Sequence, residues 1–89
     1  MNEFYEKAIE HLEEEIEDAC EYLKEADEAK ADCKPYLAEG MHKIAMDEYT
    51  HAEFLRHYLM TKRAYHTHEK HEHLEEHWHR LRERLGLEE

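Results

Sequence analysis

Glu15, Glu48 and His51 occupy positions where the repeat of this 89-residue sequence otherwise places apolar side chains. Glu48 and His51 are three residues apart, so a helix would carry both side chains on one face, about a turn from each other. Carboxylates in a core are costly unless a proton or a cation compensates them. Two carboxylates and one imidazole form an oxygen-rich donor set, which suits iron or manganese better than a structural zinc ion. These three residues are therefore the predicted metal ligands.

The connection between the two predicted helices decides which carboxylates lie at the same height. If the turn is centred near residues 31–32, Glu15 and Glu48 are equally distant from it along the chain. Antiparallel helices would then bring these two carboxylates side by side. A turn centred two or three residues later would instead place Asp18 or Glu21 opposite Glu48. Asp18 is therefore the alternative ligand.

A single copy of the chain supplies two carboxylates and one imidazole from these positions, too few to enclose a pair of metal ions. A second copy related by a two-fold axis would raise the set to four carboxylates and two histidines. This is the donor set of carboxylate-bridged dinuclear sites, in which two helices give one Glu each and two give Glu-x-x-His. The predicted partner is therefore another copy of the chain, in a homodimer or a higher assembly of dimers.

Apolar residues recur at helical spacing in the first part of the chain, which predicts a helix starting near Asn2 and ending near Lys30. Two neighbouring stripes follow this helix, a width that predicts packing against more than one partner helix. The first stripe contains Ala8, Leu12, Ala19, Tyr22, Ala26 and Ala29, and the second contains Tyr5, Ile9, Ile16, Cys20 and Leu23. Asp32 is the predicted cap of the next helix, and Pro35 fits only a first helical turn.

The second predicted helix runs to about Arg63 and also carries two stripes. One contains Leu37, Met41, Ile44, Leu55 and Tyr58, and the other contains Ala38, Ala45, Ala52 and Leu59. A weaker stripe follows at a different phase, which predicts a break near residues 64–68 before a C-terminal helix. This third stripe contains Tyr65, Leu74, Trp78, Leu81 and Leu85. Gly86 is the predicted C-cap of that helix.

Size and composition agree with one small all-α unit. Two glycines and one proline in 89 residues leave few places for the helices to break. We predict an antiparallel helical hairpin over residues 1–63 and a His-rich C-terminal helix over residues 64–89. Two hairpins are expected to pair into a four-helix bundle.

The net charge of −12 argues against binding to nucleic acid or to an anionic membrane, and it would attract cations. No apolar run approaches the length of a membrane span, and no signal-peptide pattern opens the chain. Cys20 and Cys33 lack the spacing of a redox motif and form no disulfide framework. The expected location is the cytoplasm.

The second predicted helix resembles the metal-binding helix of rubrerythrins and other ferritin-like di-iron carboxylate proteins. The resemblance rests on Ala38, Met41, Ala45, Glu48, His51 and Ala52, and in the preceding helix on Glu15, Tyr22 and Ala26. It implies that Glu15, Glu48 and His51 bind iron, two ions per dimer, with manganese or zinc as alternatives. It also implies a supporting layer of Asp47, which would steady the ligand histidine, and Tyr22, whose plainer interpretation is a core residue.

With two such helices instead of four, the chain is similar to encapsulated ferritins, which assemble their site between two chains. The implied activity is that of a ferroxidase-type oxidoreductase, which oxidises Fe(II) with oxygen or peroxide. No catalytic residue beyond the metal ligands is expected. An encapsulin shell is a further partner that the resemblance implies, although the C-terminus carries no cargo peptide that supports it.

Six histidines crowd the C-terminal segment, namely His66, His68, His71, His73, His77 and His79. His73 and His77 are four residues apart, a spacing that can bind zinc, copper or nickel. They are the candidates for a secondary metal site. The alternative is a polar helix face that happens to be rich in histidine.

Two further functions compete with the redox enzyme. The first is a protein that binds or buffers divalent metal ions without turnover. The second is a metal-free helical interaction module, in which the polar residues of an imperfect coiled-coil core set the register.

Overall fold

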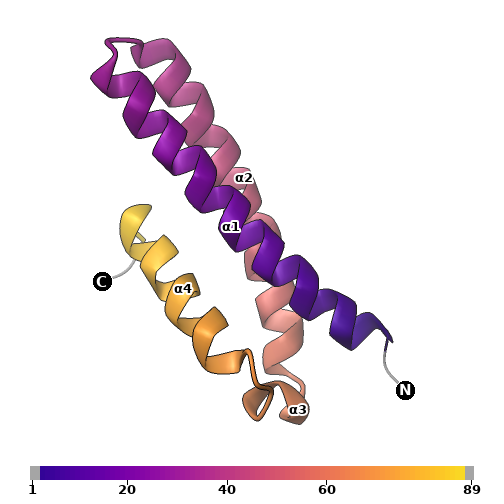
Figure 1. Cartoon of the computed structure of the whole chain (residues 1–89). Coiled ribbons are helices and arrows are strands. Elements are labelled where there is room, and N and C mark those ends of the chain that lie inside the picture. The colour runs from indigo at the N-terminus through magenta and orange to yellow at the C-terminus, as the bar shows by residue number, and fades with distance from the viewer. Residues whose placement is uncertain (1–2, 88–89) are drawn as a thin grey trace.

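The computed structural model describes residues 3–87 and contains four helices (Figure 1). They are α1 (Glu3–Ala31), α2 (Pro35–Met60), α3 (Arg63–His66) and α4 (His71–Arg84). Pro35 opens the second helix, as predicted. No strand occurs within residues 3–87, and the predicted all-α class is confirmed. None of the helices described in this part of the chain is both long and apolar enough to cross a membrane.

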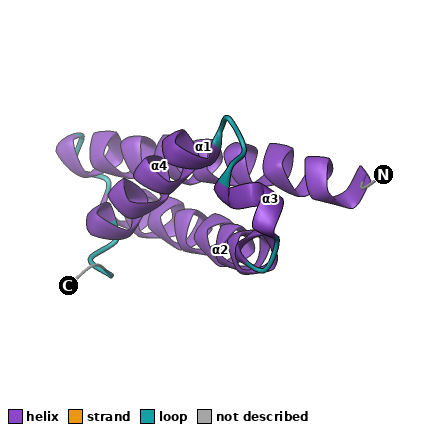
Figure 2. Cartoon of the chain, turned by 90° about the horizontal axis from the view of Figure 1, so that it is seen from below, coloured by secondary structure: helices purple, strands orange, loops and turns teal. Residues whose placement is uncertain are grey.

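α1 and α2 lie side by side as an antiparallel hairpin, and α4 returns along one side of it (Figures 1 and 2). The direction of α4 is parallel to α1. Lys70, at its start, places its ammonium 3.0 Å from a carboxylate oxygen of Glu13, and Arg84, at its end, lies 3.9 Å from a carboxylate oxygen of Asp27. The chain therefore forms a hairpin with one further helix laid along it.

The first helix ends at Ala31, one residue after its predicted end, and its predicted start near Asn2 lies outside the described residues. The second helix ends at Met60 and not near Arg63. Thr61 accounts for the earlier end, because its backbone N–H and its hydroxyl both reach the carbonyl oxygen of Tyr58, at 3.2 and 2.6 Å. Such local hydroxyl bonds compete with the helical pattern. Lys62 is then extended, with φ −103° and ψ 119°, so the chain leaves the axis of α2 before the predicted break at residues 64–68.

The turn between α1 and α2 depends on Cys33, whose backbone is left-handed with φ 58°. The N–H of Lys34 donates to the carbonyl of Ala29 at 2.8 Å, and that of Cys33 donates to the carbonyl of Lys30 at 3.1 Å. This pair of bonds is a Schellman motif. The prediction that Asp32 caps α2 is wrong, because the motif makes Lys34 the N-cap and Asp32 instead pairs with the Lys34 ammonium at 3.0 Å.

Cys33→Gly is expected to stabilise the protein by about 0.5–1 kcal/mol, because a left-handed backbone costs an L-residue roughly 1–2 kcal/mol and the greater freedom of unfolded glycine offsets part of it. Gly86 is the matched control, since it ends α4 in the same motif with φ 75°. A Cβ there would meet nothing within 4 Å, so Gly86→Ala should destabilise through the backbone alone. Urea denaturation measures both changes, and a destabilising Cys33→Gly would contradict the argument.

α4 packs into the same apolar core as the hairpin. The buried core residues are Tyr5, Ala8, Ile9, Leu12, Ile16, Ala19, Leu23, Ala45, Tyr49, Ala52, Leu59, Tyr65, Leu74, Trp78 and Leu81. Trp78 of α4 stacks on Tyr49 of α2, with ring centroids 4.8 Å apart and planes inclined by 14°. The stacked pair joins the C-terminal helix to the hairpin through one shared core.

Glu75 of α4 is held by residues of α2 and α3. Arg56 donates from Nε at 2.9 Å and from Nη2 at 2.7 Å to the two carboxylate oxygens, and the Tyr65 hydroxyl donates at 3.0 Å. Burial alone would raise the pKa of the Glu75 carboxyl, but Arg56 and Tyr65 hold this pKa below its ordinary value. The ionised carboxylate therefore fixes α4 against the side of α2 that faces it.

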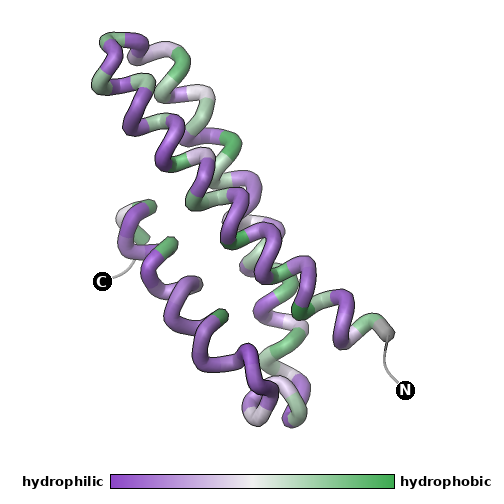
Figure 3. The backbone as a smooth tube through the Cα atoms, viewed as in Figure 1, coloured by the Kyte–Doolittle hydropathy of each residue, from purple (hydrophilic) through white to green (hydrophobic). Residues whose placement is uncertain are grey.

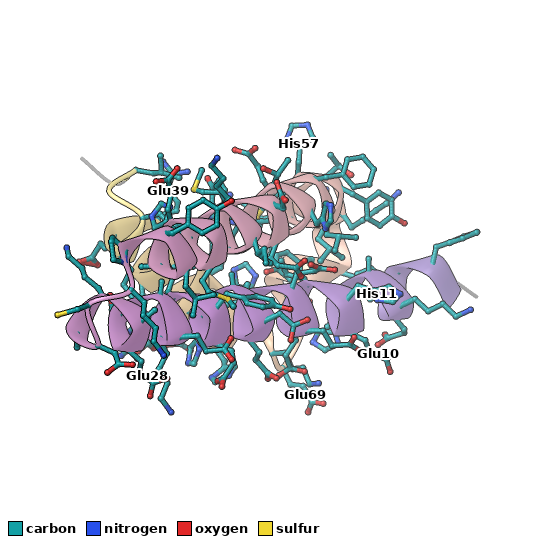
Figure 4. All side chains as sticks on the ribbon, turned by 90° about the horizontal axis from the view of Figure 1, so that it is seen from above. Glu10, His11, Glu28, Glu39, His57 and Glu69 are labelled. Atoms are coloured by element: carbon teal, nitrogen blue, oxygen red, sulfur yellow. The ribbon has the colours of Figure 1, made fainter. Side chains whose placement is uncertain are left out.

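The opposite side of the hairpin is left open in the part of the chain that the structure describes. Figures 2 and 4 view the molecule from opposite sides, and α4 lies in front of the hairpin in Figure 2 and behind it in Figure 4. Large exposed apolar side chains include Phe4, Leu37, Ile44 and Phe54, which are 80%, 45%, 38% and 73% exposed. Along each helix of the hairpin, polar and apolar residues alternate at short intervals (Figure 3).

The two stripes of α2 differ in their exposure to solvent. The stripe with Ala45, Ala52 and Leu59 is buried, whereas the stripe with Leu37 and Ile44 is exposed. Glu48 and His51 follow the exposed stripe at helical spacing. The predicted ligands therefore lie on the open side of the hairpin and not inside the core of one chain.

Candidate metal centre

Glu15 of α1 and Glu48 and His51 of α2 meet midway along the hairpin. Each offers one donor atom, and the three atoms all lie within 4.8 Å of one another. Within residues 3–87 no other group of three or more histidine, cysteine or acidic side chains comes together in this way. The spacing of three residues in α2 brings Glu48 and His51 to one face, and the antiparallel pairing brings Glu15 to the same height.

Glu15 and Glu48 are half-buried, whereas His51 is exposed. The side chain of Glu15 is 23% exposed, whereas that of His51 is 61% exposed. Oε2 of Glu15 is buried without a hydrogen-bond partner, and Nδ1 of His51 lies 3.5 Å from it, too far for a good hydrogen bond. A buried carboxylate oxygen without a partner is costly, so this atom is the part of the centre that most needs a cation.

The neighbouring Glu15 and partial burial alter the ionisation of Glu48. A hydrogen bond with Glu15 raises the pKa of the Glu48 carboxyl, and burial and the negative charge of Glu15 raise this pKa further. The charge of His51 acts in the opposite direction but does not cancel the rise. Without a metal ion, the Glu48 carboxyl therefore keeps its proton to higher pH than an ordinary glutamate does.

The structure places Glu15, and not Asp18, opposite Glu48. Asp18 is exposed and lies outside the group of three donors. Although α1 ends at Ala31 and α2 begins at Pro35, the helices pair in the register expected for the earlier turn centre. Of the two carboxylates that the sequence left open, the fold therefore brings Glu15 to the centre.

The supporting residues expected around the ligands are less closely engaged. Asp47 is exposed and acts on Glu48 through its charge, which raises the pKa of Glu48. Its predicted role in steadying His51 stays a prediction. Tyr22 is half-buried and packs against the core. His73 and His77 belong to α4 and lie outside the centre.

Sequence reasoning missed the polar contacts that hold α4 in place, namely those of Arg56, Glu75 and Tyr65, and the hydrogen bond from Arg82 to the Tyr49 hydroxyl. The weak stripe with Trp78 was the available signal, because a tryptophan at core spacing requires an apolar partner surface. Tyr49, between the two alanines of the buried α2 stripe, is that partner. These contacts cover one side of the hairpin and leave the candidate centre on the other.

Two carboxylates and one imidazole that converge from two helices can bind a divalent cation with part of its coordination shell. The remaining positions of such an ion would face outward, because His51 and the surrounding stripe are exposed. Comparisons with protein-family models, with curated proteins and with solved structures gave no match for the chain.

Proposed function

We propose that the chain is a ferritin-like metal-binding protein in which two copies enclose a carboxylate-bridged dinuclear centre, with iron as the metal. The observation that carries the proposal is the buried Oε2 of Glu15, which lacks a hydrogen bond and lies 3.5 Å from Nδ1 of His51, in a group with Glu48 whose three donor atoms lie within 4.8 Å of one another. Two carboxylates and an imidazole this close together, with a raised pKa on Glu48, favour a cation between them.

The incompleteness of the donor set supports a second copy as the partner. One chain offers three donors, all facing the open side of the hairpin, whereas a bridged pair of metal ions takes about six protein ligands. A two-fold axis over the open side would present the same three donors from the other chain. Such an interface is isologous, which is the commonest arrangement in homodimers.

The apolar surface around the centre supports the same partner. Near one end of the open side lies an apolar groove of about 310 Å³, lined by Phe4, Lys7, Ala8, His11, Phe54, Leu55 and Tyr58. Leu37 and Ile44 expose further apolar surface on the other side of the ligands along α2. Covering both regions would remove apolar area from water and close the centre from solvent.

The metal supplies the redox chemistry when bound: oxidation of Fe(II) by oxygen or peroxide. The chain supplies the geometry. Glu15 and Glu48 provide the negative charge that offsets two divalent ions across a dimer, and His51 adds one nitrogen donor per chain. Oxygen-rich donors favour iron or manganese, and zinc would fill the same centre without redox turnover.

Metal content is the direct test. Elemental analysis of protein purified without an affinity tag should give one iron or manganese ion per chain, two per dimer. Light scattering should show a dimer or a multiple of it. A folded monomer that binds metal at micromolar protein concentration would contradict the shared centre. An absorbance band that develops when Fe(II)-loaded protein meets air would support oxidase chemistry, and its absence would leave a metal-binding protein without turnover.

A further inference from the structure

His73 and His77 of α4 form a pair of imidazoles outside the hairpin centre. They are one helical turn apart, and their ring centroids lie 4.1 Å from each other with the planes tilted by 40°. His73 is exposed and His77 is half-buried, so solvent reaches the pair. The four-residue spacing keeps both rings on one face of α4. The helix itself therefore sets the two rings for chelation.

We propose that His73 and His77 form a second metal site, which takes a borderline divalent ion such as Zn(II), Ni(II) or Cu(II). Imidazole nitrogens bind zinc at about 2.0–2.1 Å, so two rings this close need only small rotations to direct one nitrogen each at a single ion. Nitrogen donors favour zinc, copper and nickel, whereas the hairpin centre offers mainly oxygen. The site is independent of the proposed function.

The pair borders a groove between α4 and α1. His77 lines this groove, which has a volume of about 620 Å³, together with Glu17 of α1. The cations that line the same groove are Lys24, Arg80 and Arg84. All three come later in their helices than Glu17 and His77, and α1 and α4 are parallel, so these cations lie beyond the site. Glu21 also lines the groove, but it lies one turn closer to Lys24, so we assign Glu17 as the third donor from the neighbouring helix. Its carboxylate does not lie within 4.8 Å of both imidazoles, so its side chain must rotate toward the ion.

A metal ion held by both helices would strengthen the contact of α4 with α1. That contact contains separate ion pairs, including Lys70 with Glu13 at 3.0 Å and Arg84 with Asp27 at 3.9 Å. Surface pairs of this kind contribute little. The expected consequence is that Ni(II) raises the melting temperature of a variant whose hairpin centre is disabled.

Full-length Glu48→Ala protein is the background for the test, because it lacks a complete hairpin centre. Calorimetric titration with Ni(II) should give one ion per chain. His73→Ala should lower the affinity by about a hundredfold, since a second tethered ligand adds at least that much. Glu17→Gln should lower it by about tenfold. His42→Ala combined with His57→Ala is the matched control, because these exposed residues of α2 are too far apart to share an ion.

Copper gives an independent readout, since the electron paramagnetic resonance spectrum of bound Cu(II) should show coupling to two nitrogen nuclei. Unchanged Ni(II) affinity in His73→Ala would overturn the site, and so would an equal loss in the His42/His57 control. A sulfur-to-copper absorption band would overturn the assignment of Glu17 in favour of Cys20, which also lines the groove. His73 is exposed, so its replacement should leave the helical content by circular dichroism unchanged. Failure of the hairpin centre would appear separately, as missing iron in wild-type protein.

Discussion

Glu48→Ala and His51→Ala are each expected to abolish metal binding at the hairpin centre, and Glu15→Ala is expected to weaken it severely. The reason is that each chain contributes three donors within 4.8 Å, and a two-fold dimer loses two donors with every substitution. Changes to groups that only support a ligand cost about 10–100-fold in affinity, so loss of a ligand should cost more than about a hundredfold. Iron stoichiometry after anaerobic loading with Fe(II) and gel filtration measures the effect.

Two matched controls accompany this experiment. Asp18→Ala removes an exposed carboxylate one turn from Glu15 and should leave iron binding unchanged. Replacing His73 and His77 together should also leave the hairpin centre intact, because both belong to α4. A greater loss in Asp18→Ala than in Glu15→Ala would mean that the helices pair in a different register. Control of iron stoichiometry by the histidine pair would move the centre to α4.

Glu48→Ala is expected to have opposite effects on the stability of the metal-free and the metal-loaded protein. Without metal, a hydrogen bond with Glu15, burial and the negative charge of Glu15 all raise the pKa of Glu48, so the ionised form of Glu48 is disfavoured in the folded protein. In the proposed dimer, four such carboxylates share one layer. Removing Glu48 should therefore leave the melting temperature of the metal-free protein unchanged or raise it. With metal, wild type should gain about 2.7 kcal/mol per site at a hundred times the dissociation constant, and Glu48→Ala should gain nothing.

The raised pKa of Glu48 fixes the sign of the pH dependence. Near and just above the ordinary pKa of 4.5, the folded protein binds more protons at this site than the unfolded chain does. Metal-free stability is therefore lost as pH rises through the raised pKa and is regained as pH falls toward 4.5. Glu75 has a lowered pKa and acts in the opposite sense. Because both proteins retain Glu75, the difference between wild type and Glu48→Ala isolates the contribution of Glu48.

Thermal melts with chelator and with excess Fe(II) or Mn(II), at equal protein concentration, decide between the metal centre and a metal-free coiled coil. In a coiled coil whose polar residues set the register, Glu48→Ala would change the oligomeric state, and neither protein would respond to metal. Equal melting temperatures of wild type with and without metal would show that the dinuclear centre is absent.

Local patterns determined much of this protein. Helical spacing of the apolar residues predicted the hairpin and the C-terminal helix, because the 3.6-residue repeat is a property of the chain itself. The donors Glu15, Glu48 and His51 could be found as interruptions of that repeat, and the i, i+3 spacing placed Glu48 with His51 on one face of α2. The placement of His73 and His77 on one face of α4 and the end of α4 at Gly86 were predictable for the same reason, since each depends on a single helix.

Only the tertiary structure decided which face of the hairpin is covered. Both stripes of α2 contain apolar residues, so the sequence does not indicate which stripe α4 buries. α4 packs on the stripe containing Tyr49, because Trp78 stacks there and Arg56 reaches Glu75, two contacts that join residues far apart in the chain. The turn likewise depended on Cys33 adopting φ 58°, a conformation that its residue type does not favour. Side-chain contacts between helices settle such choices, and a repeat within one helix carries no information about them.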